Sequence, residues 1–163
     1  MAKKASRNST KHHAPKTVVN RRARFDYELK DELKTGIALT GMEVRAARDN
    51  HVHLRGAFVT IRGGELWLNN ASFSLKVTER GQQAARTIDT RPRKLLAHKK
   101  EILALEAAAG KGTSIVPLRL ITAGKYIKLV IALGKGKKRY DKREAIKRRD
   151  SEREAQRSTK EWR

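Results

Sequence analysis

The sequence predicts a mainly β fold, a small antiparallel barrel or sandwich with about three helices attached. Short apolar runs alternate with polar residues through the middle of the chain, which is typical of strands with one face buried. Turn residues such as Gly63–Gly64 separate these runs. One longer stretch, residues 93–109, has apolar residues at helical spacing and is followed by Gly110. OB-type barrels are among the candidates, and periodicity does not choose among the small barrels.

The first elements are expected between residues 25 and 48. Apolar and charged residues alternate over 25–29, which predicts a strand. The four-residue spacing of two leucines predicts a helical turn over 30–36, and residues 37–39 are expected to form the next strand. A short helix is predicted over 41–48, because its apolar residues can share one face while the charged ones stay outside.

Five further strands share a high content of Val, Ile, Leu and Phe. They are predicted at 51–61, 65–69, 71–77, 114–122 and 126–133. Residues 78–92 are polar and are predicted to form a long loop, a feature that is often functional inside a small domain.

The positive charge is concentrated at the two ends of the chain. Of a net charge of +22, residues 1–24 carry +8 and residues 135–163 carry +7, so the 110 residues between them carry only +7. This partition predicts a disordered basic arm at 1–16, a folded body at 17–134 and a basic tail at 135–163. An excess of this size needs an anionic partner, and nucleic acid is the usual one.

Composition excludes several other classes of protein. The chain has no cysteine, and therefore no disulfide framework or thiol nucleophile. The apolar runs are too short to span a membrane, and no apolar stretch follows the basic N-terminus, so we expect a cytoplasmic protein with no membrane partner. No constellation of catalytic residues and no metal site is evident: His12–His13 and His51 with His53 lack further ligands. We therefore expect neither enzymatic activity nor a cofactor.

Two segments carry features of RNA binding. Residues 20–24 hold three arginines and one asparagine, and arginine can both pair with phosphates and stack on bases. The tail has almost no core-forming residues, so free in solution it is expected to be disordered or a fraying helix. Its glutamate–arginine and glutamate–serine spacings of four, with alanine and arginine throughout, nevertheless favour a helix on an anionic template, so we expect the tail to order on RNA. Tyr140, isolated among cations, is suited to stacking on a base. The alternative is that both segments are merely solvated basic surface.

Six motifs in one order resemble a known family. They are NRRARFDYEL at 20–29, GIALTGMEVRAAR at 36–48, GELWLNNA at 64–71, RKLLAHKKEI at 93–102, VPLRL at 116–120 and KLVIALGKGKKRYDKREAIKRRD at 128–150. Six blocks in this order are far more specific than any single one. The chain resembles the small protein B family, the bacterial partners of transfer-messenger RNA (tmRNA) in trans-translation.

The resemblance implies an OB-type barrel and a binding function without catalysis. Family members bind the tRNA-like domain of tmRNA and accompany it to stalled ribosomes, and the protein body replaces the missing anticodon arm. The tail then lies in the decoding centre and the vacant mRNA path as a helix. The implied partners are tmRNA, the 16S ribosomal RNA of the small subunit and, indirectly through the RNA, elongation factor Tu, and the protein is expected to be a monomer.

Candidate site residues follow from the matching motifs. On the RNA-binding face they are Asn20, Arg21, Arg24, Glu43, Arg45, Arg48, Lys128, Lys135 and Lys138. In the decoding-centre tail they are Lys137, Tyr140, Asp141, Lys142, Arg143, Ile146 and Lys147. The chain departs from the family pattern at Lys34, where a glutamate is common, at residues 45–47, and at 90–92, which replace the usual Asp-Pro.

Two other functions fit the sequence without the resemblance. One is a structural protein that binds ribosomal RNA through an OB-type barrel. The other is a general single-strand binder, which would stack bases on aromatic residues across a barrel face. The chain has only 3 Phe, 3 Tyr and 2 Trp, which disfavours that reading.

Overall fold

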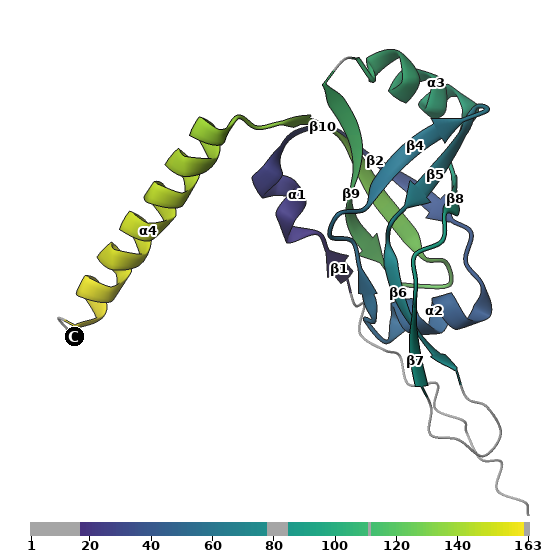
Figure 1. Ribbon diagram of the computed structural model, residues 1–163, viewed down its shortest axis with the longest axis horizontal. Coiled ribbons are helices and arrows are strands. Elements are labelled where there is room, and N and C mark those ends of the chain that lie inside the picture. The colour runs from purple at the N-terminus through teal and green to yellow at the C-terminus, as the bar shows by residue number, and fades with distance from the viewer. Residues whose placement is uncertain (1–16, 78–84, 111, 162–163) are drawn as a thin grey trace, which may run out of the picture.

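Six antiparallel strands close into a barrel in the computed structural model of the chain (Figure 1), which describes residues 17–77, 85–110 and 112–161. Around the ring they are β9 (Thr113–Ile121), β10 (Lys128–Gly136), β2 (Tyr27–Ile37), β8 (Arg93–Leu96), β5 (Glu65–Asn69) and β4 (Phe58–Arg62). The pair Val59–Ile115 closes the ring between β4 and β9, and β1 (Thr17–Val19) pairs with the remainder of the β9 edge. The mainly β prediction is confirmed, and the closed ring is consistent with an OB-type barrel. The predicted arm at 1–16 lies outside the described residues.

The barrel interior is an apolar core. Fully buried members include Leu66, Leu68, Leu120, Leu129 and Ile131, which come from three different strands. Burying one such side chain stabilises the fold by about 1.5–3 kcal/mol. The alternation of residues 65–69 therefore reports the inward face of β5 correctly.

A second apolar cluster lies outside the barrel, beneath helix α1 (Arg21–Asp26). Ala23 of α1 packs with Val116 and Leu118 of β9 and with Val130 and Ala132 of β10. Because β10 is covered on both faces, its apolar run is continuous rather than alternating. The strand predicted to begin at Phe25 is therefore wrong at its start, since Phe25 belongs to α1 and β2 begins at Tyr27.

The helical turn predicted over 30–36 is wrong, because β2 runs through it. Asp31 has a φ of 45°, and the β2–β10 register shifts there, so Asp31 is the extra residue of a β-bulge. The bulge sends residues on its two sides to different faces: Leu33 packs on the barrel core and Leu29 on the cluster beneath α1. The four-residue spacing of these leucines thus reflects two cores instead of one helix.

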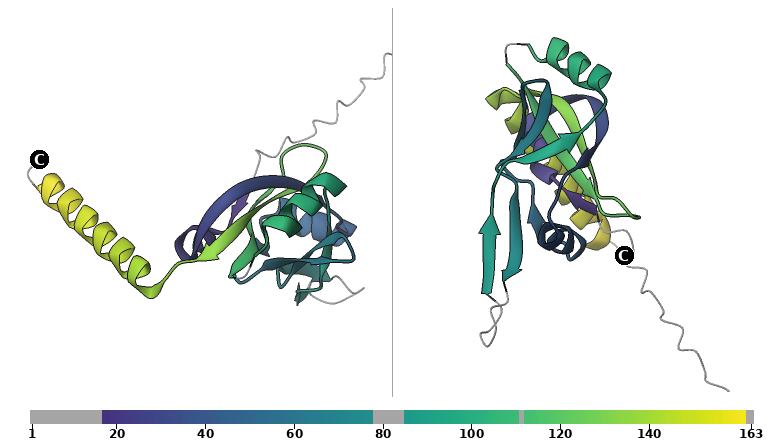
Figure 2. Two further views of the ribbon diagram at one scale, coloured as in Figure 1. Left: turned by 90° about the horizontal axis from the view of Figure 1, so that it is seen from above. Right: turned by 90° about the vertical axis from the view of Figure 1, so that its right-hand side faces the viewer.

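A small three-stranded sheet stands beside the barrel. It consists of β3 (Val52–His53), β6 (Ser72–Val77) and β7 (Ala85–Asp89), and α2 (Gly41–Arg48) packs on β6. Figures 1 and 2 show β6 and β7 projecting from the body as a hairpin. The helix at 41–48 is confirmed. The loop predicted at 78–92 is wrong over β7, while residues 78–84 lie outside the described residues.

Two other predicted elements are split in the structure. The strand predicted at 51–61 forms β3 and β4, divided by a turn in which Gly56 has a φ of 75°. The helix predicted at 93–109 begins only with α3 (Lys99–Ala108), because the preceding residues form β8 between β5 and β2. A fourth helix, α4 (Arg139–Glu161), follows β10 and extends away from the barrel (Figure 1).

Candidate nucleic-acid interface

The arginine segment forms a short helix whose basic side chains face solvent. Arg21, Arg22 and Arg24 are exposed on α1, whereas Ala23 is buried against the barrel. The guanidinium of Arg24 lies 3.6 Å from a carboxylate oxygen of Glu32 on β2. The packing of Ala23 in the apolar cluster holds the helix on the barrel, and its three arginines face solvent.

Asn20 holds α1 to the barrel. Its side-chain oxygen accepts from the backbone N–H of Ala23 at 3.3 Å, and its amide donates to the carbonyls of Leu54 and Pro117, both at 3.0 Å. Its own backbone N–H donates to Leu118 at 2.7 Å. The residue is buried, and both of its amide hydrogens are engaged within the protein. These contacts fix the start of the helix that carries Arg21, Arg22 and Arg24.

Helix α2 carries Glu43 inward and two arginines outward. Thr40 caps the helix, and its backbone N–H donates to Glu43 Oε2 at 2.7 Å, which completes a capping box. Arg45 and Arg48 are exposed in the last turn, where positive charge is favourable to the helix dipole.

Glu43 is the centre of a buried ionic network. Its carboxylate has no exposed surface and accepts from Arg91 Nε at 2.9 Å, Arg91 Nη2 at 2.7 Å and Arg93 Nε at 2.8 Å. Arg93 is also fully buried; it donates to the carbonyls of Ala71 and Arg91 and lies 3.9 Å above the Phe73 ring. Asp89 lies 3.4 Å from Arg93 and 3.5 Å from Arg91. The network thus joins α2 to the ends of β7 and β8.

The network keeps both central groups charged. Burial by itself raises the pKa of Glu43, but the Thr40 N–H and the guanidinium groups of Arg91 and Arg93 outweigh it, and the pKa lies below its ordinary value. Burial lowers the pKa of Arg93, while Glu43 and Asp89 oppose that effect. Glu43 was predicted on the RNA-binding face; the structure places its carboxylate behind Arg91, whose side chain is 45% exposed.

Lys128 lies at a groove with aliphatic walls and a basic rim. The groove measures about 350 Å³ and is lined by residues of β2, α2, β8 and the β9–β10 turn, among them Leu39, Val44, Leu96, Lys125, Tyr126 and Lys128. Leu96 is 55% exposed and Tyr126 is 66% exposed, with the Lys125 ammonium 5.4 Å from the tyrosine ring. An exposed aromatic ring beside two lysines can stack a base and bind its phosphates.

Sequence reasoning missed Leu96 and Tyr126 as surface residues. A signal for Leu96 was present, because adjacent residues of a strand point to opposite faces and Leu95 is in the core. Tyr126 follows the Gly124 turn, and nothing in the sequence pattern showed that its ring would be exposed.

The root of the tail is attached to α1. The backbone N–H of Lys137 donates to the Asp26 carbonyl at 2.9 Å, and its Nζ donates to the Arg24 carbonyl at 3.1 Å. Lys135 and Lys138 are exposed on either side of it. The structure therefore brings the α1 arginines together with the tail root. Lys128 lies at the other end of β10, seven residues before Lys135 and therefore roughly 23 Å from it along the strand.

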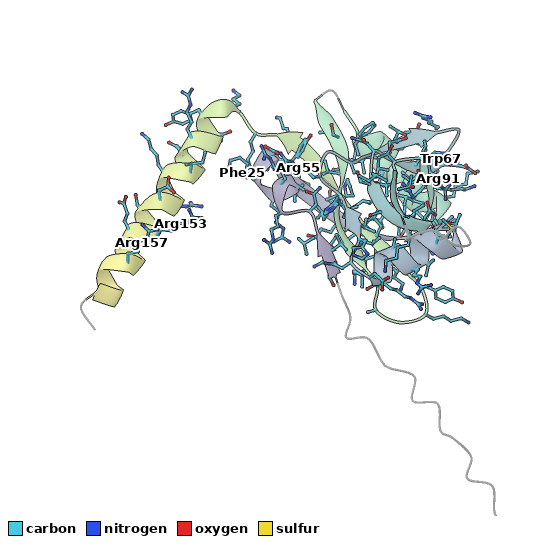
Figure 3. The ribbon with its side chains drawn as sticks, turned by 60° about the horizontal axis from the view of Figure 1, so that its bottom comes forward. Phe25, Arg55, Trp67, Arg91, Arg153 and Arg157 are labelled. Carbon is cyan, nitrogen blue, oxygen red and sulfur yellow. The ribbon has the colours of Figure 1, made fainter. Side chains whose placement is uncertain are left out.

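The tail residues lie on one long exposed helix. Tyr140, Arg143, Ile146 and Lys147 are exposed, and the Asp141 carboxylate accepts from the Lys138 N–H at 3.1 Å. A hydrogen bond with Glu144 raises the pKa of Tyr140. The side chain of Lys142 lies outside the described part of the structure. Figure 3 shows Arg153 and Arg157 projecting from α4, with Phe25 and Arg55 on the α1 side of the barrel and Arg91 on the opposite side.

The positive surface is thus divided among α1 with the tail root, α2 with the groove at Lys128, and α4. A family model described as SmpB protein matches residues 17–161, a range that includes every residue the structure describes. The chain belongs to the SmpB family.

Individual SmpB relatives agree with the family match. The chain is 42% identical over 144 residues to an SsrA-binding protein of Ligilactobacillus salivarius, covering 88% of this chain and 91% of the relative. It is 43% identical over 143 residues to an SsrA-binding protein of Shouchella clausii, covering 87% and 90%. A solved structure titled "tmRNA-SmpB: a journey to the center of the bacterial ribosome" matches with a TM-score of 0.58 and 36% identity, over 80% of this chain and 94% of that one.

The SmpB match includes α4, so the tail helix belongs to the family region and is not an appendage to it. Among the residues that the structure describes, none of the helices is long and apolar enough to cross a membrane. Within the same residues, His, Asp and Glu form no group of three that could hold a metal ion.

Proposed function

We propose that this chain binds the tRNA-like domain of tmRNA and delivers it to stalled ribosomes for trans-translation. The observation that carries the proposal is the separation of its cationic surfaces. One set lies on the barrel, at α2 and the groove beside Lys128, and another lies on a tail helix that leaves the opposite end of β10. A protein that bridges two RNAs needs two such surfaces.

The barrel surfaces are suited to a folded RNA. Arg45, Arg48 and Lys128 supply exposed cations, and Tyr126 with Leu96 supplies an apolar platform for an unstacked base. Folded RNA is recognised by phosphate and 2′-hydroxyl contacts and by stacking of splayed bases. Relatives carry the name SsrA-binding protein, and the matching structure is titled for a complex of tmRNA with SmpB.

The tail is suited to an extended path lined by RNA. Helix α4 has 23 residues and extends about 34 Å at 1.5 Å for each residue. Its described side chains include both acidic and basic groups around Tyr140 and Ile146, and all of these described side chains are exposed. We assign the tail to the decoding centre and the empty mRNA path, with 16S ribosomal RNA as its partner. The prediction that it orders on binding stays a prediction.

The same proposal covers the remaining partners. Elongation factor Tu associates indirectly through the tmRNA, the protein acts as a monomer in the cytoplasm, and its function is binding without catalysis. The alternative of a structural protein of the ribosome is disfavoured by relatives named for SsrA binding.

Competition binding tests the proposal. Labelled tmRNA is titrated with the full chain at 100 mM and 200 mM KCl, with unlabelled bulk tRNA as competitor. We expect tmRNA to be preferred at both salt concentrations, since shape and base contacts add to the phosphate contribution. Equal affinity for the two RNAs would refute it.

A truncation after Lys138 tests the division of labour. This end point keeps the contacts of Lys137 with α1, so the barrel and tail root stay intact. We expect the truncated chain to keep its preference for tmRNA but to lose tagging of peptides on stalled ribosomes. Normal tagging by the truncated chain would contradict the role given to α4.

A further inference from the structure

Two hollows flank the turn between β3 and β4, and the proposed function uses neither of them. The smaller measures about 280 Å³ and is lined by β1, the start of α1 and residues 52–55. The larger measures about 680 Å³ and is lined by α1, residues 56–61 and residues on either side of the connection from α3 to β9. Asn20 and Arg22 line both hollows, so the two adjoin at the start of α1.

The smaller hollow is basic. Buried and exposed side chains alternate over residues 52–55, which places His53 and Arg55 on the outside. Arg21 and Arg22 line the same hollow from α1, and none of the described residues that line it is acidic. Arginine binds phosphate through two parallel hydrogen bonds, so this hollow is suited to a phosphate group.

The larger hollow contains an exposed aromatic ring. Phe58 is 45% exposed, whereas its two neighbours in the chain are each 5% exposed, so the ring lies on the outside of β4. Asp26 and Glu106 line the same hollow, and their carboxylates make it less favourable for a phosphate. A carboxylate can accept from the amino group of a base, and an aromatic ring can stack on the base. The larger hollow is therefore suited to an unstacked base.

Hydrogen bonds hold the turn that separates the two hollows. The Asn20 amide donates at 3.0 Å to the carbonyl of the residue before Arg55, which ties this segment to the start of α1. The Asn70 amide donates to the Gly56 carbonyl at 3.1 Å, and Gly56 has a φ of 75°. Arg55 and Phe58 thus lie on either side of a fixed turn. A site formed before its ligand arrives loses less conformational freedom on binding.

We propose that the turn between β3 and β4 binds one nucleotide of RNA, with its phosphate at Arg55 and its base stacked on Phe58. This inference rests on the proposed function. We assign the nucleotide to 16S ribosomal RNA, because both hollows are lined by α1, and Lys137 at the root of the tail is hydrogen-bonded to α1. Figure 3 shows Arg55 on this side of the barrel and Arg91 on the opposite side. The barrel thus contacts the small subunit directly, in addition to the tail.

Binding of the full chain to isolated small ribosomal subunits tests the site, with tmRNA binding as the reference. Each phosphate contact contributes about 0.7–0.9 to the slope of log Kd against log salt, or about 3-fold in Kd between 50 and 200 mM KCl. R55Q should therefore lose about 3-fold of that salt-induced change. F58A should weaken subunit binding about 5- to 150-fold through the lost stacking. Both variants should bind tmRNA as the wild type does.

The matched control K76Q removes an exposed cation of β6 that lines neither hollow, and it should bind the subunits with the full salt slope. Equal losses in R55Q and K76Q, or wild-type affinity of F58A for the subunits, would overturn the inference. A loss of tmRNA affinity in R55Q and F58A as large as their loss of subunit affinity would also overturn the assignment to 16S ribosomal RNA.

Crosslinking identifies the RNA and covers the case of a misfolded variant. Benzoylphenylalanine, which keeps an aromatic ring, is placed at Phe58 or, as a control, at Ile88, an exposed apolar residue of β7. We expect position 58 to crosslink to 16S ribosomal RNA and position 88 not to. Crosslinking of position 58 only to tmRNA or to a protein would refute the assignment. Failure of the proposed function is seen separately, as equal affinity of the wild-type chain for tmRNA and tRNA.

Discussion

Replacing Glu43 by glutamine tests the buried network most directly. The substitution keeps the size of the side chain but removes the charge that balances Arg93, which has no exposed surface. Removing one partner of a buried ion pair costs about 3–5 kcal/mol, because the other charge is left uncompensated. Measured unfolding free energies of small domains are about 5–15 kcal/mol, so E43Q should lose a large part of the stability.

Urea denaturation at pH 7 measures the loss, and E65Q is the control. Glu65 pairs with Lys94 on the surface, with both side chains 42% exposed, and such a pair contributes about 0–1 kcal/mol. A loss in E43Q below about 1 kcal/mol, equal to that in E65Q, would refute the view that the network stabilises the base of the hairpin.

The pH dependence of E43Q provides a second check on the same network. The folded-state pKa of Glu43 is lowered, so its contribution to stability is complete above the unfolded value of about 4.3 and is lost as the pH falls through the folded value. The difference in unfolding free energy between wild type and E43Q should therefore be constant near neutrality and shrink below about pH 4. If the difference in unfolding free energy between wild type and E43Q grew as the pH fell, the pKa of Glu43 in the folded state would be raised and not lowered.

Three further predictions concern packing, capping and stacking. Gly134→Ala should destabilise by about 1–3 kcal/mol in thermal unfolding, since a Cβ would meet Tyr27 at 3.0 Å, whereas Gly136→Ala meets nothing within 4 Å and should be neutral. Asn20→Ala should lose about 2 kcal/mol in urea unfolding through the lost cap and two unpaired carbonyls, and an intact stability would contradict that role. Tyr126→Ala should weaken tmRNA binding by about 1–3 kcal/mol while Tyr126→Phe retains it; equal binding would exclude stacking.

The location of the excess positive charge was predictable from the sequence, but which motif residues are exposed and which are buried was not. The basic segment at 20–24 does carry exposed arginines, as composition suggests. Asn20 and Glu43 stand in motifs assigned to the RNA-binding face, yet both are buried, and their hydrogen-bond partners come from segments 34 to 97 residues away. No local pattern reports such distant partners.

Local periodicity also predicted the wrong secondary structure where one strand packs against two separate apolar clusters. Leu29 and Leu33 have helical spacing, yet the bulge at Asp31 sends them to opposite faces of one strand. Residues 93–96 continue the apolar pattern of the following helix, but their pairing with β2 and β5 makes them a strand. Long-range hydrogen bonds outweigh local propensity in both places.

The sequence by itself determined the strand-rich composition, the helix at 41–48, the two basic ends and the motifs of the SmpB family. Those properties depend on residue type and short-range spacing, which a linear pattern contains. Only the tertiary structure decided that the barrel closes through Val59 and Ile115, that Glu43 and Arg93 form a buried pair, and that the tail root is attached to α1 through Lys137. Each of these depends on groups far apart in the chain meeting in one place, and their energies arise from desolvation and geometry that exist only after folding.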